Sequence, residues 1–164
     1  MVFVTVGNAT QEFGRLLHAV DTLAGSEIFQ HDCIFIQTGH NRDFHPRHCE
    51  YAPFLSLDEF QLRMEKADLI ISHGGCTQLH AIRLGKIPVV MPRRRKYHEH
   101  VNDHQMQLVR ALAQEGKVIA AYEPHDLPAA VVQAASRRPA LISRPSSPML
   151  ALVMEAMEQV LSPP

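Results

Sequence analysis

The chain has 164 residues, 46% of them hydrophobic and 20% charged, with a formal net charge of −1. This length and composition fit one globular domain with a hydrophobic core, and the balanced charge excludes the basic field typical of nucleic-acid-binding proteins. No apolar run approaches the ~18 residues of a membrane span, and the opening run ends at Gly7, too early for a signal sequence. Cys33, Cys49 and Cys76 contain no Cys-x-x-Cys pair and cannot all pair with each other, so we expect a reducing, cytoplasmic setting.

The first half of the chain alternates short apolar runs with amphipathic stretches. Val2–Val6 is rich in β-branched residues and predicts a buried strand, whereas apolar residues at helical spacing from Phe13 to Leu23 predict a helix. We expect strands at Val2–Val6, Asp32–Thr38 and, more weakly because of Pro53, His48–Phe54, and helices at Gln11–Leu23 and Leu57–Ala67.

The second half of the chain continues this alternation. We expect strands at Asp68–Ser72, Pro88–Met91 and Lys117–Ala121, and helices at Thr77–Leu84, Asn102–Glu115 and Pro124–Ser136. Gly85 and Gly116 follow two of these helices, in the position where glycine commonly ends a helix.

The residues after 136 have a different character. Arg137–Pro148 contains three prolines and three serines and predicts a linker. Leu150–Leu161 carries two apolar stripes at helical spacing, which predicts a last helix that is buried on two sides, either on its own domain or on a partner. We therefore divide the chain into a nucleotide-sugar-binding domain at 1–136, a linker at 137–148, and a terminal helix and tail at 149–164.

Strands that alternate with helices predict an α/β fold: a Rossmann-like open parallel sheet of about six strands with helices on both faces. Ligands of such sheets lie at the carboxyl ends of the strands. The loops expected at that edge carry glycine, histidine or amide groups, and they contain Gly7, Gly39, Phe54, His73–Thr77 and Pro92–Asn102.

The segment His73–Thr77, with sequence His-Gly-Gly-Cys-Thr, joins a predicted strand to a predicted helix. A glycine turn here exposes backbone amides beside the positive end of a helix, which is where phosphates and diphosphates bind. Residues 100–105, His-Val-Asn-Asp-His-Gln, follow one strand–helix unit later and can approach the same crevice. Together these segments predict a nucleotide-sugar site, and the alternative is an ordinary tight turn.

Five motifs occur in order along the chain: FVTVG, PF before a helix, ADLIISHGG, LGKIPVVMPR and HVNDHQ. In this order they resemble the C-terminal domain of family 28 glycosyltransferases. The resemblance is closest to the small single-domain members, namely the nucleotide-sugar-binding subunit of the two-component UDP-GlcNAc transferase and bacterial relatives of the PssE type. It extends from about Val2 to Tyr122 and implies one half of a GT-B fold.

The resemblance also implies how a UDP-sugar is held. Turn amides and Arg93 would contact the diphosphate, His104 and Gln105 the sugar hydroxyls, and the backbone at Phe54 the uracil. The alternatives are that Arg93 belongs to a solvated basic loop and that Phe54 packs in the core. The implied contacts are Gly7, Asn8, Phe54, Leu55, His73, Gly74, Gly75, Cys76, Thr77, Arg93, His104 and Gln105.

The function implied by the resemblance is that of a donor-binding subunit in a two-chain glycosyltransferase. A membrane-associated, acceptor-binding subunit would present a lipid-linked acceptor and hold this chain at the cytoplasmic membrane face. No cofactor or metal is expected, because the histidines at 98, 100 and 104 lack a further cysteine or carboxylate for zinc. No catalytic residue is assigned.

Two other functions remain open at this stage. The family usually has a second glycine where Thr77 stands and a hydroxyl residue at Gln78, and its ribose-binding acid would fall at Ala81. A binding or regulatory module that no longer holds nucleotide tightly is therefore the main alternative. A nucleotide-sugar epimerase or hydrolase is a weaker one, because it would need carboxylates that the ligand-end loops scarcely offer.

Overall fold

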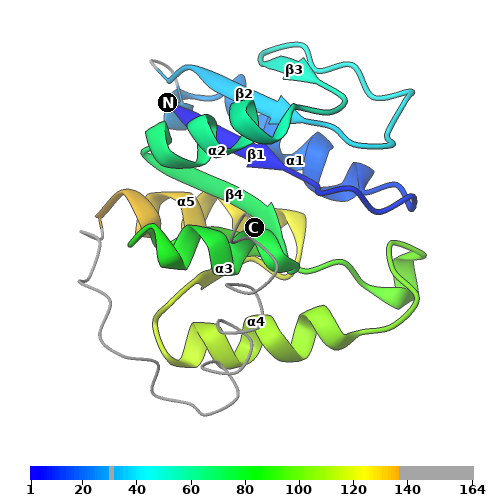
Figure 1. The fold of residues 1–164 in the computed structure, drawn as a ribbon, viewed down its shortest axis with the longest axis vertical. Helices are drawn as coiled ribbons and strands as arrows, with labels where there is room; N and C mark the ends of the chain where they lie inside the picture. Colours follow the sequence, from blue (N-terminus) through cyan, green and yellow to red (C-terminus); the bar gives the residue numbers. More distant parts are fainter. Residues whose placement is uncertain (30–31, 137–164) are drawn as a thin grey trace, which may run out of the picture.

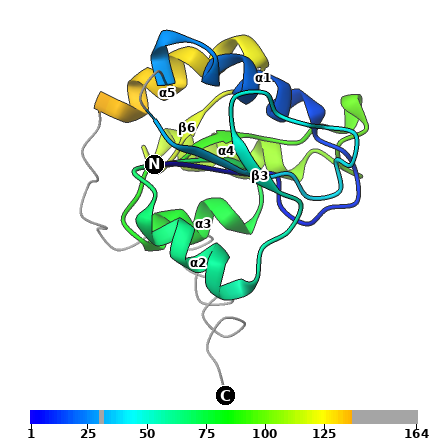
Figure 2. The same ribbon diagram turned by 90° about the horizontal axis from the view of Figure 1, so that it is seen from above.

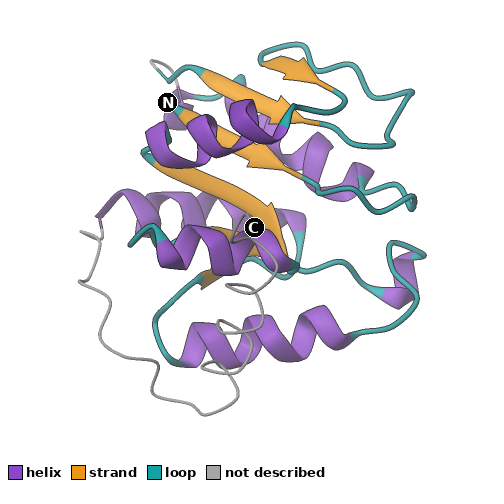
Figure 3. Cartoon of the chain, in the orientation of Figure 1, coloured by secondary structure: helices purple, strands orange, loops and turns teal. Residues whose placement is uncertain are grey.

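The structure is a computed structural model that describes residues 1–29 and 32–136 (Figure 1). Six parallel strands form one sheet in the order β3-β2-β1-β4-β5-β6. Figure 3 shows the strands in orange between purple helices. Their bounds are β1 Val2–Thr5, β2 Ile34–Gln37, β3 Glu50–Ala52, β4 Leu69–His73, β5 Val89–Met91 and β6 Ile119–Ala120. This is the predicted Rossmann-like α/β fold, and the chain reverses its direction of travel across the sheet between β1 and β4.

Helices cover both faces of the sheet. Helices α1 and α5 lie on one face, and α2 and α3 lie on the other (Figure 2). Helix α4 packs beside α3, because Val109 and Leu112 of α4 share a buried cluster with Leu79 and Ile82 of α3. The bounds are α1 Gly14–Ala24, α2 Leu57–Lys66, α3 Cys76–Arg83, α4 His104–Gln114 and α5 Leu127–Ser136, with 3-10 turns η1 Glu27–Phe29, η2 Arg95–Tyr97 and η3 Pro124–Asp126.

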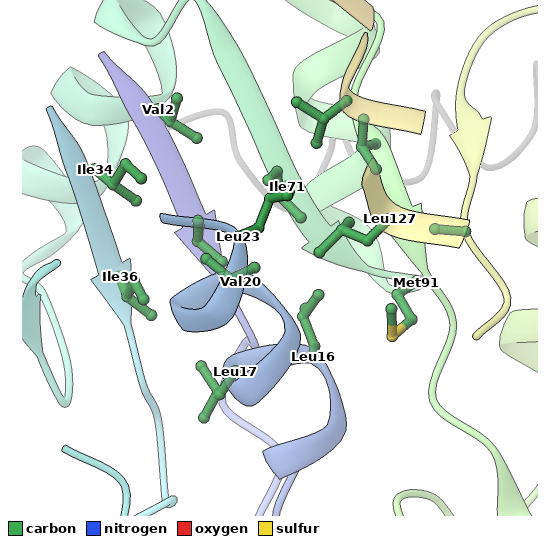
Figure 4. Packing of buried hydrophobic residues seen from close by; sticks show 14 of the residues in the cluster. Val2, Leu16, Leu17, Val20, Leu23, Ile34, Ile36, Ile71, Met91 and Leu127 are labelled. Carbon is green, nitrogen blue, oxygen red and sulfur yellow. The ribbon is translucent and has the colours of Figure 1, made fainter. Parts of the chain in front are cut away.

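The strands are apolar on both sides because both of their faces are covered. On one face, Val2 and Val4 of β1 pack with Leu16 and Val20 of α1 and with Leu127 of α5 (Figure 4). On the other face, residues of alternate register form a second cluster with α2 and α3, made of Phe3, Phe35, Met64, Ala67, Ile70 and Ala81. The central strands therefore read as continuous apolar runs, as the sequence predicts.

All the strands and helices expected within residues 1–136 are present, with shifts at their ends. The predicted strand at His48–Phe54 shortens to Glu50–Ala52, an edge strand that ends before Pro53. The predicted helix at Asn102–Glu115 begins only at His104, because the Asn102 side chain accepts a hydrogen bond from the backbone amide of His104. The predicted linker and terminal helix lie outside the described residues. Within the described residues, no helix has the length and apolar content that crossing a bilayer requires.

Candidate active site

The turns after β1 and β4 meet at the point where the strand order reverses. Between them lies the imidazole of His73. A methyl group added to Gly7 would lie 2.5 Å from His73 Cε1, and one added to Gly75 would overlap Nε2 of the same ring. Glycine is thus required on both sides of this ring. Gly7 also has a left-handed backbone, with φ of 72°. Ligands of open parallel sheets bind at this reversal point.

Helix α3 begins with unsatisfied amides. Gly75 is its N-cap and has no side chain to cap it, and the amides of residues 74–77 donate no hydrogen bond to another described residue. Cys76 is exposed and Thr77 is partly exposed. Helix α2 is different, because Ser56 and Glu59 close its first turn with a capping box. The start of α3 therefore keeps the backbone donors and the positive dipole that bind an anion.

His73 is neutral in this setting. Burial, and to a smaller extent the nearby cation of Arg93, lower its pKa from the ordinary 6.5 to about 4. Its Nδ1 is buried and has no hydrogen-bond partner among the described residues. The ring therefore acts here as an uncharged spacer between the two glycine turns.

Arg93 lies behind the turns and does not face an open cleft. Its side chain is fully buried and donates hydrogen bonds to the carbonyls of Val6 at 2.8 Å, Gln11 at 2.7 Å and Glu99 at 3.1 Å. Its guanidinium also stacks on Phe13, 4.7 Å from the ring centroid. The Arg93 guanidinium is therefore already bonded within the fold, and its predicted contact with a diphosphate stays a prediction. Arg93 joins the loop after β5 to the loop after β1.

A second arginine, Arg15, connects α1 to the loop after β5. Arg15 of α1 makes a two-point ion pair with the buried carboxylate of Glu99, at 2.8 Å for both pairs of atoms. The basic run that follows Arg93 is also used within the fold, because Arg94 and Lys96 pair with Glu123. Most of the run Arg93–Lys96 therefore connects loops of the fold and does not form a free basic patch.

Gln105 is brought to the turn after β4, whereas His104 stands at the rim. A methyl group on Gly74 would lie 3.0 Å from Gln105 Cβ, and Gln105 Oε1 accepts a hydrogen bond from the Arg93 backbone amide at 3.0 Å. The side chain of His104 is exposed. Of the two residues expected to contact a sugar, Gln105 thus lies against the glycine turn, with its Nε2 making no hydrogen bond to another described residue.

Phe54 lies at the outer edge of the sheet. Its side chain is 47% exposed and contacts the ring of His40 edge-on, 5.0 Å between centroids. The alternative that Phe54 packs in the core is therefore wrong, whereas Leu55 does pack partly against the cluster under α2. The Phe54–Leu55 backbone is separated from the β4 turn by the ends of β2 and β1.

A buried polar relay behind Gly7 was missed by the sequence reasoning. The Gly7 amide donates to Thr5 Oγ1 at 3.1 Å, and the Thr5 hydroxyl donates to Gln37 Oε1 at 2.7 Å. Gln37 Nε2 in turn donates to Asn8 Oδ1 at 3.3 Å. The sequence does hold a signal for this relay, because Thr5 and Gln37 are the single polar residues at the ends of the apolar strands β1 and β2. The relay orients the turn that carries Gly7 and Asn8.

The sequence profile described as "Glycosyltransferase family 28 C-terminal domain" matches residues 1–160. The chain belongs to this family. A search of the solved structures finds a similar fold in the "Crystal Structure Analysis of the Glycotransferase of kitacinnamycin", with a TM-score of 0.53 and 20% sequence identity. The match covers 97% of this chain and 38% of that one, so this chain spans well under half of its structural neighbour. No curated protein matches the chain.

In this family 28 domain, the residues at the position of the ribose-binding acid face the core. Ala81 is fully buried in the cluster with Phe3 and Met64, and Gln78 is fully buried with neither amide atom paired among the described residues. His80 is partly buried beside the ring of Phe60. Ala81 and Gln78 are therefore closed off from solvent, whereas His80 is only partly covered.

The described part of the family 28 domain contains no cluster of potential metal ligands. No group of three or more histidine, cysteine, aspartate or glutamate residues in residues 1–29 and 32–136 is arranged to hold a metal ion. The positive charge available to an anion at the reversal point is the partial charge of the α3 amides, with the cation of Arg93 held behind the turns.

Proposed function

We propose that this glycosyltransferase domain is the donor-binding subunit of a two-chain enzyme that transfers a sugar from UDP to a lipid-linked acceptor. Family membership supports a glycosyltransferase domain that binds a nucleotide sugar. The observation that carries the proposal is the uncapped start of α3 beside the Gly7 turn. That start offers unpaired amides at the one point of the sheet where ligands of this fold bind.

The arrangement favours a diphosphate as the bound group. The amides of residues 74–77 lie in succession at the amino end of α3, so they can donate to several phosphate oxygens at once. The two glycine turns leave room for the His73 ring, which holds the Gly7 turn beside the start of α3. The free Nε2 of Gln105 would donate to a hydroxyl of the sugar beyond the diphosphate.

In the proposed reaction, an acceptor hydroxyl oxygen forms a bond to the anomeric carbon, and the bond from that carbon to the β-phosphate oxygen breaks. The electron pair leaves with UDP. The α3 amides would stabilise the charge that grows on the departing phosphate, because they are fixed in place before the reaction begins. The hydroxyl proton would go to a base on the partner chain.

The proposed arrangement assigns the acceptor to a partner. The structural match covers 38% of the neighbour, and the described residues of this chain form one sheet with its helices. We propose that the acceptor-binding half is a second chain, which also places this subunit at the cytoplasmic face of a membrane.

The test is a screen of binding and of transfer. UDP at one hundred times its dissociation constant should raise the free energy of unfolding of the chain by about 2.7 kcal/mol, and ADP and GDP should do less. Transfer to a polyprenyl-linked acceptor should need a membrane-anchored second chain. Full-rate transfer by the isolated chain would refute the two-chain arrangement and leave the donor site intact.

A second candidate function is a non-catalytic module that keeps the fold. The observation that favours it is the burial of Ala81 and Gln78, which leaves the ribose without the acidic partner expected for this family. Failure of UDP, ADP and GDP alike to shift the unfolding temperature would select this function.

A further inference from the structure

The ring of His73 lies between the two glycine turns of the candidate site. A methyl group added to Gly75 would overlap its Nε2, and one added to Gly7 would lie 2.5 Å from its Cε1. The ring therefore touches both the Gly7 turn and the start of α3. Nδ1 is buried without a hydrogen-bond partner, and Nε2 makes no hydrogen bond to another described residue. Both ring nitrogens thus lack a partner within the described part of the fold.

The groups that face this ring keep it neutral in the free protein. Arg93, from the loop after β5, and His100, from the loop before α4, both oppose a second proton on the ring, whereas the backbone carbonyl of Thr5 favours it. The two glycine turns bring no side chain to the ring. Glu99, the acidic residue bonded to Arg93 through its backbone, already pairs its carboxylate with Arg15 at 2.8 Å. The described surroundings of the ring thus supply no anion to balance a positive charge.

A bound diphosphate would reverse this balance. The uncapped amides of α3 attract an anion to the side of the ring where Nε2 lies. Arg93 is held back from that side, because its guanidinium is bonded to the carbonyls of Val6, Gln11 and Glu99. An opposite charge within ~4–6 Å of a titratable group favours its charged form. The His73 ring can therefore bring to the phosphates the full positive charge that the amides lack.

We propose, on the basis of the proposed donor site, that His73 takes up a proton when a nucleoside diphosphate binds at the start of α3, and that Nε2–H of the imidazolium then donates to a phosphate oxygen. The proton comes from solvent and returns to it when the nucleotide leaves. In the free protein, the neutral ring avoids a second buried cation beside Arg93. In the complex, the new charge stabilises the departing phosphate together with the α3 amides.

Calorimetric titration of the full-length chain with UDP counts this proton. In two buffers of different ionisation enthalpy, the difference in the heat of binding gives the number of protons taken up per UDP. At about pH 5.5 the ring of the free chain is neutral, because the pKa of His73 is about 4. A rise of that pKa by about two pH units on binding adds about 0.7 of a proton. UDP itself has a phosphate proton that titrates near pH ~6, so the count is compared between variants.

Two variants supply the comparison. His73→Gln can form hydrogen bonds but cannot gain a charge, so it should take up about 0.7 fewer protons per UDP than the wild type. His100→Gln removes the other titratable ring that acts on His73 and should match the wild-type count. Equal counts in the wild type and His73→Gln, or a lower count in His100→Gln instead, would overturn the proposal and leave the donor site intact. Absence of UDP binding in the wild type would overturn both.

Histidine NMR on the wild type covers the case in which His73→Gln folds poorly or binds UDP too weakly. The Cε1 proton of His73 can be assigned through its closeness to Gly7, because Cε1 lies against that residue. Its titration midpoint should rise by about two pH units when UDP is saturating. The ring of His80, which lies beside the ring of Phe60, should titrate alike with and without UDP. An unchanged midpoint for His73 in the UDP complex would contradict the proposal.

Discussion

The ring of His73 fills the space that a side chain at Gly75 would need. The same ring lies against Gly7, so two turns from strands far apart in the sequence share one spacer. The relationship explains why glycine stands on both sides of this histidine. The position of the uncapped start of α3 therefore also depends on the His73 ring, which is largely buried.

Gly7→Ala should destabilise the chain for two reasons. Gly7 has φ of 72°, and a methyl group there would lie 2.5 Å from His73 Cε1. We expect a loss of about 2–4 kcal/mol in the free energy of unfolding, measured by urea denaturation. Gly116→Ala is the matched control, because its φ is 69° but nothing lies within 4 Å of the added carbon. Equal losses in the two variants would mean that contact with the His73 ring does not matter.

Arg93→Met should destabilise the chain strongly although it keeps most of the side-chain length. The substitution leaves the carbonyls of Val6, Gln11 and Glu99 without their donor in a buried place. We expect a loss of about 3 kcal/mol or more in the free energy of unfolding. The control Arg95→Met removes an exposed side chain and should stay within about 0.5 kcal/mol of the wild type. If Arg93→Met folds with normal stability but fails to bind UDP, Arg93 contacts the ligand directly and this structural role is wrong.

Stability should fall as the pH falls from 6.5 towards 4. His73 has a folded pKa of about 4 against an ordinary 6.5, so in this window the unfolded chain takes up a proton that the native chain does not. The stabilisation linked to this residue is present above pH 6.5, and it diminishes by about 3 kcal/mol by pH 4. Urea denaturation at several pH values should give a shallower dependence for His73→Gln. An unchanged slope in that variant would assign the pH dependence to other groups.

Gln37→Glu should weaken nucleotide binding, and it should also destabilise the fold because Gln37 is buried and a carboxylate there loses its hydration. Glutamate keeps the acceptor for the Thr5 hydroxyl but loses the amide that donates to Asn8. We expect UDP affinity to drop roughly tenfold, about 1.4 kcal/mol, by calorimetry. Gln61→Glu, on the exposed face of α2, is the control for the added charge. If a folded Gln37→Glu variant binds UDP with unchanged affinity, the Asn8 side chain does not contribute to the donor site.

The sheet and its glycine turn could be predicted from the sequence because they depend on local patterns. Short apolar runs predicted the strands, and the stretches with helical spacing between them predicted the helices. The pair Gly74-Gly75 predicted the turn after β4. The ends of the elements were less predictable, because they depend on particular contacts. Helix α4 starts late because Asn102 and Asp103 use their side-chain oxygens on nearby backbone amides.

The place of Arg93 could not be predicted from sequence. Four consecutive cations look like a solvated loop or an anion site, since a pattern does not show which of them turns inward. Burial of Arg93 needs carbonyls from the loop after β1, more than eighty residues earlier, to converge on its guanidinium. The Gln37 relay was missed for the same reason, because its partners come together only when β1 and β2 pair.

The central claim is that the amides at the start of α3 hold the diphosphate of a UDP-sugar, and calorimetric titration with UDP tests it most directly. The wild type and Gly14→Ala should bind alike, because a methyl group on Gly14 would make only an ordinary contact with His18, 3.5 Å away. Gly75→Ala, whose methyl group would displace the His73 ring, should lose at least about tenfold in affinity. Absence of UDP binding in the wild type, or equal binding by a folded Gly75→Ala variant, would contradict the claim.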